Sequence, residues 1–183
     1  FAEYKNKFIC REKSGGIEIV RTWLFAATGR GAERLLNYFS FSVTAFFGAL
    51  KVQKPDYIFT ESPPLFLGKS GWMLSVIHRS KFIFNVSDLW PESAEKLGIV
   101  KNKLMLRTAR HLEEFLYKRS FFISGQTQGI VNNIKSRFPD KNVYWLPNGV
   151  DLDYFVPEKN NLWRKENNYA EDDFIMIYAG IIG

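Results

Sequence analysis

The feature that most constrains the fold is the regular alternation of short apolar runs with longer helical patterns over residues 56–146. In the longer segments apolar residues recur at three- and four-residue steps, which is typical of helices. The short runs are apolar at consecutive positions, as expected of parallel strands buried on both faces. The sequence therefore predicts an α/β fold, a Rossmann-like parallel sheet with helices on both faces. The expected strands are 56–60, 81–87, 121–125 and 142–146, and the expected helices are 63–78, 101–120 and 127–138.

Two further elements are expected before this alternation begins. Gly15 and Gly16 lie between two apolar runs, which predicts a hairpin or another strand connection. Residues 29–53 carry apolar side chains at helical spacing and predict a helix of about five turns.

A change of composition marks the end of the domain. Residues 147–168 are polar and contain two prolines, so they are expected to form a linker. Residues 173–180 are apolar again and are expected to begin a new strand. We therefore predict an N-terminal Rossmann-like domain over residues 1–156, truncated at its start. Residues 157–183 are predicted to be a linker and the first strand of a second, truncated domain.

Charge and cysteine content narrow the classes of partner. The 183 residues carry a net charge of +6, which indicates an anionic neighbour: a phosphate ligand, a lipid surface or nucleic acid. Cys10 is the single cysteine, so an internal disulfide is excluded and a reducing, cytoplasmic compartment is expected. With two histidines in the chain, a histidine-rich zinc site is not expected, and we predict no metal.

The edge of the sheet where ligands bind can be predicted from topology. In an open parallel sheet, ligands bind beyond the carboxyl ends of the strands. This rule selects four loops, all rich in hydrogen-bonding groups: 61–64, 87–93, 125–129 and 147–151.

Asp88 is the most specific candidate on these loops, because it directly follows an apolar strand within the motif SDLWPES. A carboxylate at a strand exit faces the binding edge and can orient a hydroxyl group. Ordinary helix-start chemistry is the alternative, because Pro91 suits a first helical position and Glu92 suits the positive end of a helix dipole. The residues alone leave both interpretations open.

The other loops give weaker signals, each with a structural interpretation. Asn148 and Gly149 form a common turn pair. Thr127 suits a helix N-cap. Pro63 and Pro64 stiffen their loop and can start a helix.

Basic and aromatic residues gather in the long helix expected over residues 29–53. Arg30 and Arg34 open the helix, and Phe39, Phe41, Phe46 and Phe47 follow. Such a helix can form an amphipathic surface that contacts anionic lipid. The alternative is a solvated face with no partner.

Several motifs together resemble glycosyltransferase family 4, in the branch that builds bacterial surface polysaccharides such as O-antigen, lipopolysaccharide and capsule. The resemblance covers about residues 14–183 and rests on the segments PDYIFTESPPLFLG, FIFNVSDLWPESAEKLGIVKN, LEEFLYKRS, LPNGVDLDYFVP and IYAGIIG. It implies a GT-B enzyme, in which two Rossmann-like domains face each other across a cleft. This chain would be the N-terminal acceptor domain and the first strand of the donor domain.

The resemblance also implies a reaction: a retaining transfer of a hexosyl or acetamidosugar group from a nucleotide-diphosphate sugar to an acceptor hydroxyl. The expected acceptor is a polyprenyl-diphosphate-linked saccharide, and the expected location is the cytoplasm, or peripherally the inner face of the plasma membrane. The nucleotide sugar is a substrate, and neither a cofactor nor a nucleic-acid partner is expected. Because the family's paired donor-domain glutamates and its first glycine-rich loop are not in this sequence, the chain alone is expected to be inactive.

Site roles follow from that reaction and from position. Asp88 would be catalytic and orient the acceptor hydroxyl or the sugar, with Glu92 as a second carboxylate nearby. The acceptor side would be lined by Glu61, Ser62, Pro63, Thr127 and Asn148. The resemblance further implies that Gly180 and Gly183 approach the donor phosphates, as the glycine-bearing loop after this strand does in the family. Glycine suits this role because it lets backbone N–H groups come close to an anion.

Two other functions are alternatives. A nucleotide-sugar epimerase of the same architecture would release nucleotide without any acceptor. A non-catalytic basic module would bind nucleic acid or membrane with steep salt dependence, although the sequence carries no RNA- or DNA-recognition signature.

Overall fold

The computed structural model describes residues 7–27, 32–157 and 162–180 of the chain. It divides into two compact units, Phe1–Asn148 and Gly149–Gly183, which are described separately below. The division falls at the end of the last strand of the sheet, inside the segment whose composition predicted a linker.

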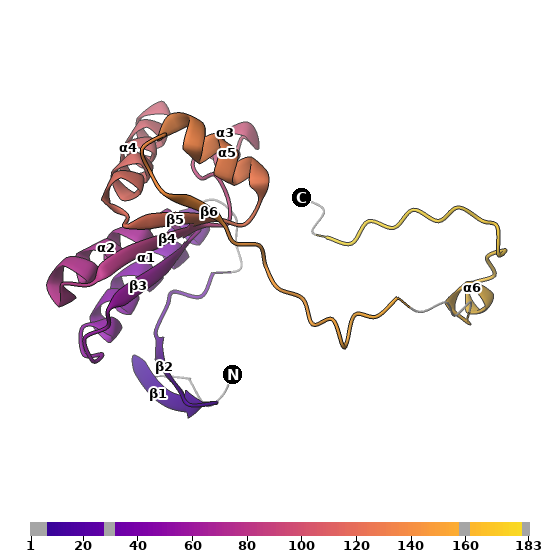
Figure 1. The fold of residues 1–183 in the computed structure, drawn as a ribbon, viewed down its shortest axis with the longest axis horizontal. Helices are drawn as coiled ribbons and strands as arrows, with labels where there is room; N and C mark the ends of the chain where they lie inside the picture. The colour runs from indigo at the N-terminus through magenta and orange to yellow at the C-terminus, as the bar shows by residue number, and fades with distance from the viewer. Residues whose placement is uncertain (1–6, 28–31, 158–161, 181–183) are drawn as a thin grey trace. The chain divides into compact units, whose positions relative to one another are not determined.

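The N-terminal unit is built on a four-stranded parallel sheet (Figure 1). Its strands are β3 (Tyr57–Ser62), β4 (Lys81–Val86), β5 (Phe122–Gly125) and β6 (Val143–Trp145), and neighbours in space follow one another in sequence. Five of the six β4 residues are buried, because β4 has a neighbouring strand on each side. The α/β class and the Rossmann-like arrangement predicted from the sequence are confirmed.

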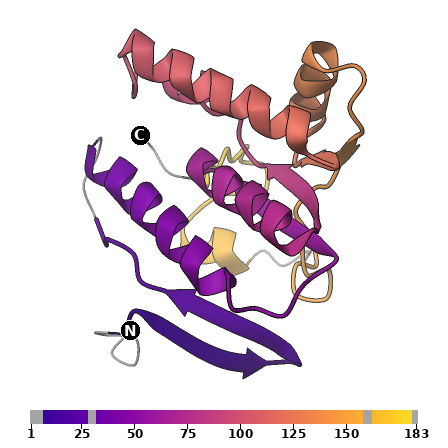
Figure 2. The ribbon, with the colours of Figure 1, turned by 90° about the vertical axis from the view of Figure 1, so that its left-hand side faces the viewer.

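The helices that connect successive strands are α2 (Leu65–His78), α4 (Lys103–Arg119) and α5 (Gln128–Arg137), with the short α3 (Glu92–Lys96) before α4. Figure 2 shows α1, α2 and α4 side by side in front of the sheet. One core joins α2, α4 and α5 to the same face of β4, β5 and β6. Its buried members include Leu65, Phe82, Phe84, Leu116, Ile123, Ile134 and Val143.

Two glycines allow α2 to lie directly on the sheet. A Cβ atom at Gly68 would come within 2.7 Å of both Leu116 Cδ1 and Phe84 Cε2, and one at Gly71 would collide with the side chain of Thr60. Larger residues at either position would lift the helix away from β3 and β4, so the close packing depends on these glycines.

The opposite face of the sheet is more exposed than the face that packs on α2, α4 and α5. Along β3, Thr60 and Ser62 are buried, whereas the alternate residues Tyr57 and Phe59 are each 52% exposed. Tyr144 of β6 is also more than half exposed. Within the described residues, the connecting helices cover one face, and the second face presents aromatic side chains. The α/β class is as predicted, but the helices expected on both faces lie on one face of the described sheet.

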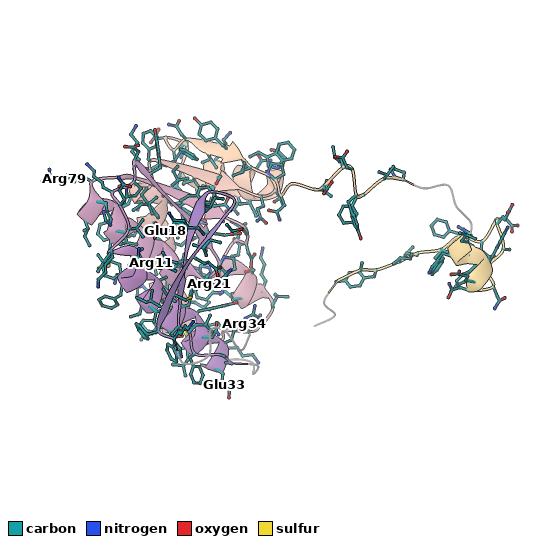
Figure 3. The ribbon with its side chains drawn as sticks, turned by 90° about the horizontal axis from the view of Figure 1, so that it is seen from below. Arg11, Glu18, Arg21, Glu33, Arg34 and Arg79 are labelled. Atoms are coloured by element: carbon teal, nitrogen blue, oxygen red, sulfur yellow. The ribbon has the colours of Figure 1, made fainter. Side chains whose placement is uncertain are left out.

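A hairpin and a long helix precede the sheet, as predicted. Strands β1 (Ile9–Ser14) and β2 (Ile17–Thr22) pair antiparallel around Gly15 and Gly16, whose φ angles are +56° and +82°. Positive φ at both central positions favours glycine, which explains the pair. An Arg11–Glu18 ion pair links the two strands across the hairpin (Figure 3).

Helix α1 (Ala32–Ala49) packs against both α2 and β2. Thr44 Oγ1 donates to the carbonyl of Trp23 at 2.6 Å, and the backbone N–H of Phe25 donates to Ser40 Oγ at 2.9 Å. Ser70 Oγ of α2 donates to the carbonyl of Ser42 at 2.8 Å. These bonds fix α1 beside α2 and hold the segment after β2 along α1.

The ends of two helices follow familiar capping chemistry. Asn102 Oδ1 accepts from the backbone N–H groups of Leu104 and Met105, and Thr127 Oγ1 accepts from that of Ile130 at 3.2 Å. The N-cap interpretation of Thr127 is confirmed. Leu104 of α4 is 73% exposed, because it lies in the first turn, beyond the part of α4 that packs on the core.

The C-terminal unit contains one described helix, α6 (Leu162–Glu166), inside the segment predicted as a linker. The strand predicted for 173–180 is wrong for the described residues, which form no strand there. Phe174 and Met176 are 88% and 84% exposed. A strand is stabilised by a neighbouring strand, and none of the described residues pairs with this segment.

Candidate functional site

Side chains from the carboxyl ends of all four parallel strands meet in one hydrogen-bonded group, which we call the strand-end network: Glu61, Ser87, Gln126 and Asn148. Ser87 Oγ donates to Glu61 Oε1 at 2.5 Å. Gln126 Nε2 donates to Asn148 Oδ1 at 3.0 Å and also reaches Glu61 Oε1, at 3.4 Å. The network lies at the edge of the sheet where topology predicts ligand binding.

Backbone hydrogen bonds hold these loops in register beyond the ends of the strands. The N–H of Ser87 donates to the carbonyl of Ser62 at 2.9 Å, and the N–H of Gln126 donates to that of Val86 at 3.1 Å. Trp145 Nε1 donates to the carbonyl of Gln126 at 3.2 Å. The positions of the network side chains therefore follow from the sheet itself.

The chemistry of the strand-end network suits a ligand with hydroxyl groups. Glu61 is exposed and forms no ion pair with any residue that the structure describes. Its carboxylate accepts only from a hydroxyl and an amide, and a sugar hydroxyl can replace either donor at similar geometry. An anionic ligand would be repelled by the uncompensated carboxylate.

Asp88 directly follows Ser87 of the strand-end network and lines a cavity of about 230 Å³ that we call the Asp88 pocket. Most of its wall is apolar, and the polar groups are few. The residues lining it are Arg34, Leu35, Tyr38, Pro63, Asp88, Trp90, Ser93, Ala94, Leu97, Ile99 and Val100. Helix α1, the β3–α2 loop and the α3 region all contribute to this wall.

The carboxylate of Asp88 is held by the start of α3. Asp88 Oδ2 accepts from Ser93 Oγ at 2.7 Å, and the carbonyl of Asp88 accepts from the N–H of Trp90 at 2.9 Å. Asp88 Oδ1 accepts no hydrogen bond from any residue that the structure describes. Asp88 therefore helps to order the turn, and its Oδ1 has no hydrogen-bond partner among the described residues, so the two sequence-based interpretations are compatible.

Glu92 does not share this pocket. It lines a separate cavity of about 410 Å³, together with Lys96, Arg110 and Arg137. Glu92 Oε1 lies 2.5 Å from Lys96 Nζ, and that hydrogen bond is the main reason that the pKa of Glu92 is lowered. The structure thus places Asp88 and Glu92, which the sequence grouped together, in two different pockets.

A buried ion pair lies beside the Glu92 cavity, in a group that we call the Glu113 cluster: Glu113, Tyr117 and Arg137. Glu113 is 2% exposed and accepts two hydrogen bonds from Arg137, of 3.1 and 2.7 Å. Burial is the main cause that raises the pKa of Tyr117 far above its usual range, and the neighbouring Glu113 carboxylate adds to it. This cluster joins α4 to α5.

The remaining predicted residues occupy varied positions. Ser62 is 2% exposed, and Pro63 lines the Asp88 pocket. The hydroxyl of Thr127 is engaged as the cap of α5. Gly180 belongs to the C-terminal unit, and Gly183 lies outside the described residues.

Sequence reasoning missed Gln126, which connects Glu61 to Asn148. It also missed Arg34 and Tyr38 as wall residues of the Asp88 pocket. Gln126 could have been found as the first residue after the strand predicted at 121–125. Arg34 and Tyr38 could not, because α1 precedes the sheet and its position against α3 is a tertiary feature.

Comparison with known proteins adds no relative: no model of a protein family matches the chain, and no curated protein matches it significantly. In the described part of the chain, no helix is both long and apolar enough to cross a bilayer. Among the same residues, no three His, Cys, Asp or Glu side chains are grouped so that they could hold a metal ion.

Proposed function

We propose that this chain is the acceptor-binding part of a retaining GT-B glycosyltransferase that acts in bacterial surface-polysaccharide synthesis. The donor is a nucleotide-diphosphate sugar, and the acceptor is a saccharide linked to polyprenyl diphosphate. The observation that carries the proposal is the pairing of a polar strand-end network with an apolar, carboxylate-bearing pocket on the same loops. The motifs that resemble glycosyltransferase family 4 form these loops.

The separation of a polar network from a mainly apolar pocket matches a lipid-linked saccharide acceptor. A lipid-linked saccharide offers hydroxyl groups at one end and an apolar chain at the other, with phosphates between them. Glu61, Gln126 and Asn148 supply acceptors and donors for hydroxyl groups. A ligand that is polar throughout, or apolar throughout, would contact only one of the two sites, the strand-end network or the Asp88 pocket.

Asp88 has a defined part in the proposed reaction. Transfer proceeds through a transition state with oxocarbenium character and a negatively charged leaving group. Asp88 Oδ1 accepts a hydrogen bond from the incoming acceptor hydroxyl and fixes its direction, while Oδ2 stays bonded to Ser93. Groups that neutralise the leaving diphosphate belong to the donor domain, to which Gly180 and Gly183 are assigned.

Peripheral membrane binding is part of the same proposal. One side of α1 carries Leu36, Phe39, Val43 and Phe47, which are 39–55% exposed and spaced at helical intervals. Arg34 lies in the first turn of this helix (Figure 3). An exposed apolar stripe beside cationic groups is the pattern of helices that lie on anionic bilayers. Arg30, which also contributed to this expectation, lies outside the described residues.

The test is Asp88→Asn in the complete reading frame, since donor binding is assigned to a second domain. Sugar transfer to a polyprenyl-diphosphate saccharide should fall about 100-fold or more, while the circular-dichroism spectrum and melting temperature stay unchanged. Asp140→Asn is the matched control, because Asp140 is an exposed carboxylate in the turn between α5 and β6 and lines neither the Asp88 pocket nor the strand-end network.

Turnover of Asp88→Asn at the wild-type rate would remove Asp88 from the mechanism. Release of free nucleotide in the absence of acceptor would instead support a nucleotide-sugar epimerase. DNA binding by this chain that weakens steeply with salt would support a non-catalytic basic binding module.

A further inference from the structure

We propose that Trp145 is a stacking platform for an uncharged sugar ring of the acceptor, next to the sugar whose hydroxyl Asp88 orients. This inference rests on the proposed function and narrows the class of sugar that the strand-end network accepts. Trp145 adds an apolar contact that the polar network lacks.

The side chain of Trp145 is held at its polar edge and is otherwise open. Its Nε1 donates to the carbonyl of Gln126 at 3.2 Å, yet the residue is 53% exposed. Among the described residues, no aromatic ring stacks on the indole, and Trp145 is not one of the side chains packed against the core of the sheet. The protein thus orients an indole without covering it, as in binding sites where an aromatic group contacts a ligand.

Gln126 connects this indole to the strand-end network. Its main-chain carbonyl accepts from Trp145 Nε1, and its side-chain Nε2 donates to Asn148 Oδ1 at 3.0 Å. A sugar ring carries hydroxyl groups around its edge and C–H groups on its faces. The network offers hydrogen-bonding groups for the edge, and the indole offers a flat apolar surface for one face. A ligand without hydroxyl groups would leave the polar side chains of the network without partners.

The charges at the strand ends select against acidic sugars. Residues 61–64, 87–93, 125–129 and 146–148 contain no lysine or arginine, although the whole chain carries a net charge of +6. Glu61 is exposed and has no cationic partner among the described residues. A uronate carboxylate placed beside Glu61 would therefore be repelled, and no basic residue on these loops would compensate.

The register of the sheet gives the spacing between Trp145 and Asp88. Val86, Gly125 and Trp145 lie level with one another across β4, β5 and β6, and Asp88 follows shortly after Val86. Adjacent strands lie about 4.8 Å apart, so the ends of β4 and β6 are separated by roughly 10 Å, about the length of a disaccharide. Trp145 is therefore placed to contact the sugar next to the one that reacts.

Binding of sugars to this chain tests the proposal without donor or catalysis. The probes are the methyl glycosides of glucose, galactose and mannose, each compared with its own uronide by saturation-transfer NMR and ligand titration. At least one neutral glycoside should bind, and its uronide should bind at least about threefold more weakly at low salt. Failure of all three neutral glycosides to bind would overturn the proposal. Equal or tighter binding of the uronide would overturn its charge selectivity.

Two tryptophans provide a matched pair of variants. Trp145→Leu removes the flat ring but keeps an apolar side chain, and it should weaken binding of the neutral glycoside about fivefold or more. Trp23→Leu should change binding by less than about twofold, because Trp23 is similarly exposed, at 45%, but stacks on Phe8 beside the β1–β2 hairpin. Equal losses in both variants, or wild-type affinity in Trp145→Leu, would overturn the role of Trp145.

Trp145→Phe separates stacking from a merely structural role. It keeps an aromatic face and loses the hydrogen bond to Gln126, so it should bind the neutral glycoside more tightly than Trp145→Leu. Equal affinities of the two variants would overturn stacking as the source of the contact. The melting temperature of each variant, measured by circular dichroism, identifies any loss that comes from unfolding.

Glu61→Gln separates charge from stacking. It should bring the affinities of the neutral glycoside and its uronide close to equality, because the repelling carboxylate is gone. Trp145→Leu should weaken both probes and leave their ratio unchanged. An unchanged ratio in Glu61→Gln would exclude Glu61 as the source of selectivity and overturn that half of the proposal.

Transfer assays distinguish failure of this inference from failure of the proposed function. If the complete enzyme transfers sugar but its KM for the saccharide acceptor is insensitive to Trp145→Leu, the stacking role fails and the activity stands. If neutral glycosides bind with the expected dependence on Trp145 but no nucleotide sugar supports transfer, the activity fails and the sugar-binding site stands.

Discussion

Two clusters of polar side chains, the Glu113 cluster between α4 and α5 and the strand-end network, differ in burial and charge balance. In the Glu113 cluster the carboxylate is almost fully buried and accepts two hydrogen bonds from Arg137. In the strand-end network Glu61 is exposed and has no cationic partner among the described residues. A buried, neutralised pair has no capacity left for a ligand, whereas an exposed, uncompensated carboxylate does. The contrast predicts a role in stability for the first cluster and a role in binding for the second.

Glu113→Gln should give the largest effect on stability. It removes the buried carboxylate and leaves the Arg137 guanidinium, whose side chain is 32% exposed, without its counterion, which should cost about 1–3 kcal/mol of unfolding free energy. Urea denaturation followed by circular dichroism measures this loss. Arg137→Gln should cost a similar amount, and a loss below about 1 kcal/mol in both variants would place the cluster outside the stabilising core.

Tyr117 should make stability depend on alkaline pH. Its pKa in the folded protein is raised, mainly by burial, so the folded state keeps the proton where the unfolded chain releases it. The stabilising contribution is complete below the unfolded pKa of about 10 and falls above it by about 1.4 kcal/mol per pH unit. Denaturation at pH 9 and pH 11 in wild type and Tyr117→Phe measures this slope, which the variant should reduce. An equal slope in both proteins would assign the alkaline loss to other groups.

Glu61→Gln should have the opposite effect to Glu113→Gln: little loss of stability and a clear loss of activity. The exposed side chain keeps its shape and loses its charge, so the unfolding free energy should change by less than about 0.5 kcal/mol. Under the proposed function, kcat/KM for the saccharide acceptor should fall about tenfold or more, since a charge-assisted hydrogen bond to a hydroxyl becomes a neutral one. A variant that is strongly destabilised, or that retains full activity, would break the distinction between the two clusters.

Lys96→Ala should have the smallest effect. The Lys96–Glu92 pair lies on the surface of α3, and exposed pairs of this spacing contribute little to stability. The midpoint of urea denaturation should stay within its measurement error, at both low and high salt. A clear shift would mean that the pair orders α3 and therefore the turn that carries Asp88.

The sequence predicted the central alternation because apolar periodicity and strand order are local properties. Each strand from β3 to β6 was located, and so was the edge of the sheet where Glu61 and Asn148 meet through Gln126; that this edge binds a ligand stays a prediction. The strand expected at 173–180 failed because a strand depends on a partner that local pattern does not reveal. Asp88 and Glu92 were grouped because they are close in sequence. In the structure they line two separate pockets, because Glu92 is the first residue of α3 and Asp88 lies in the loop before it.

The two glycines of α2 limit which sequences this fold can tolerate. A saturation-mutagenesis library of α2, selected for folded protein, should retain almost no substitutions at Gly68 and Gly71. Lys69, between them, should accept most residue types, because it is exposed. Because α2 begins directly after the loop containing Pro63, a helix displaced from the sheet should also move this wall residue of the Asp88 pocket. Tolerance to mutation in this helix is thus coupled to the shape of a surface some turns away.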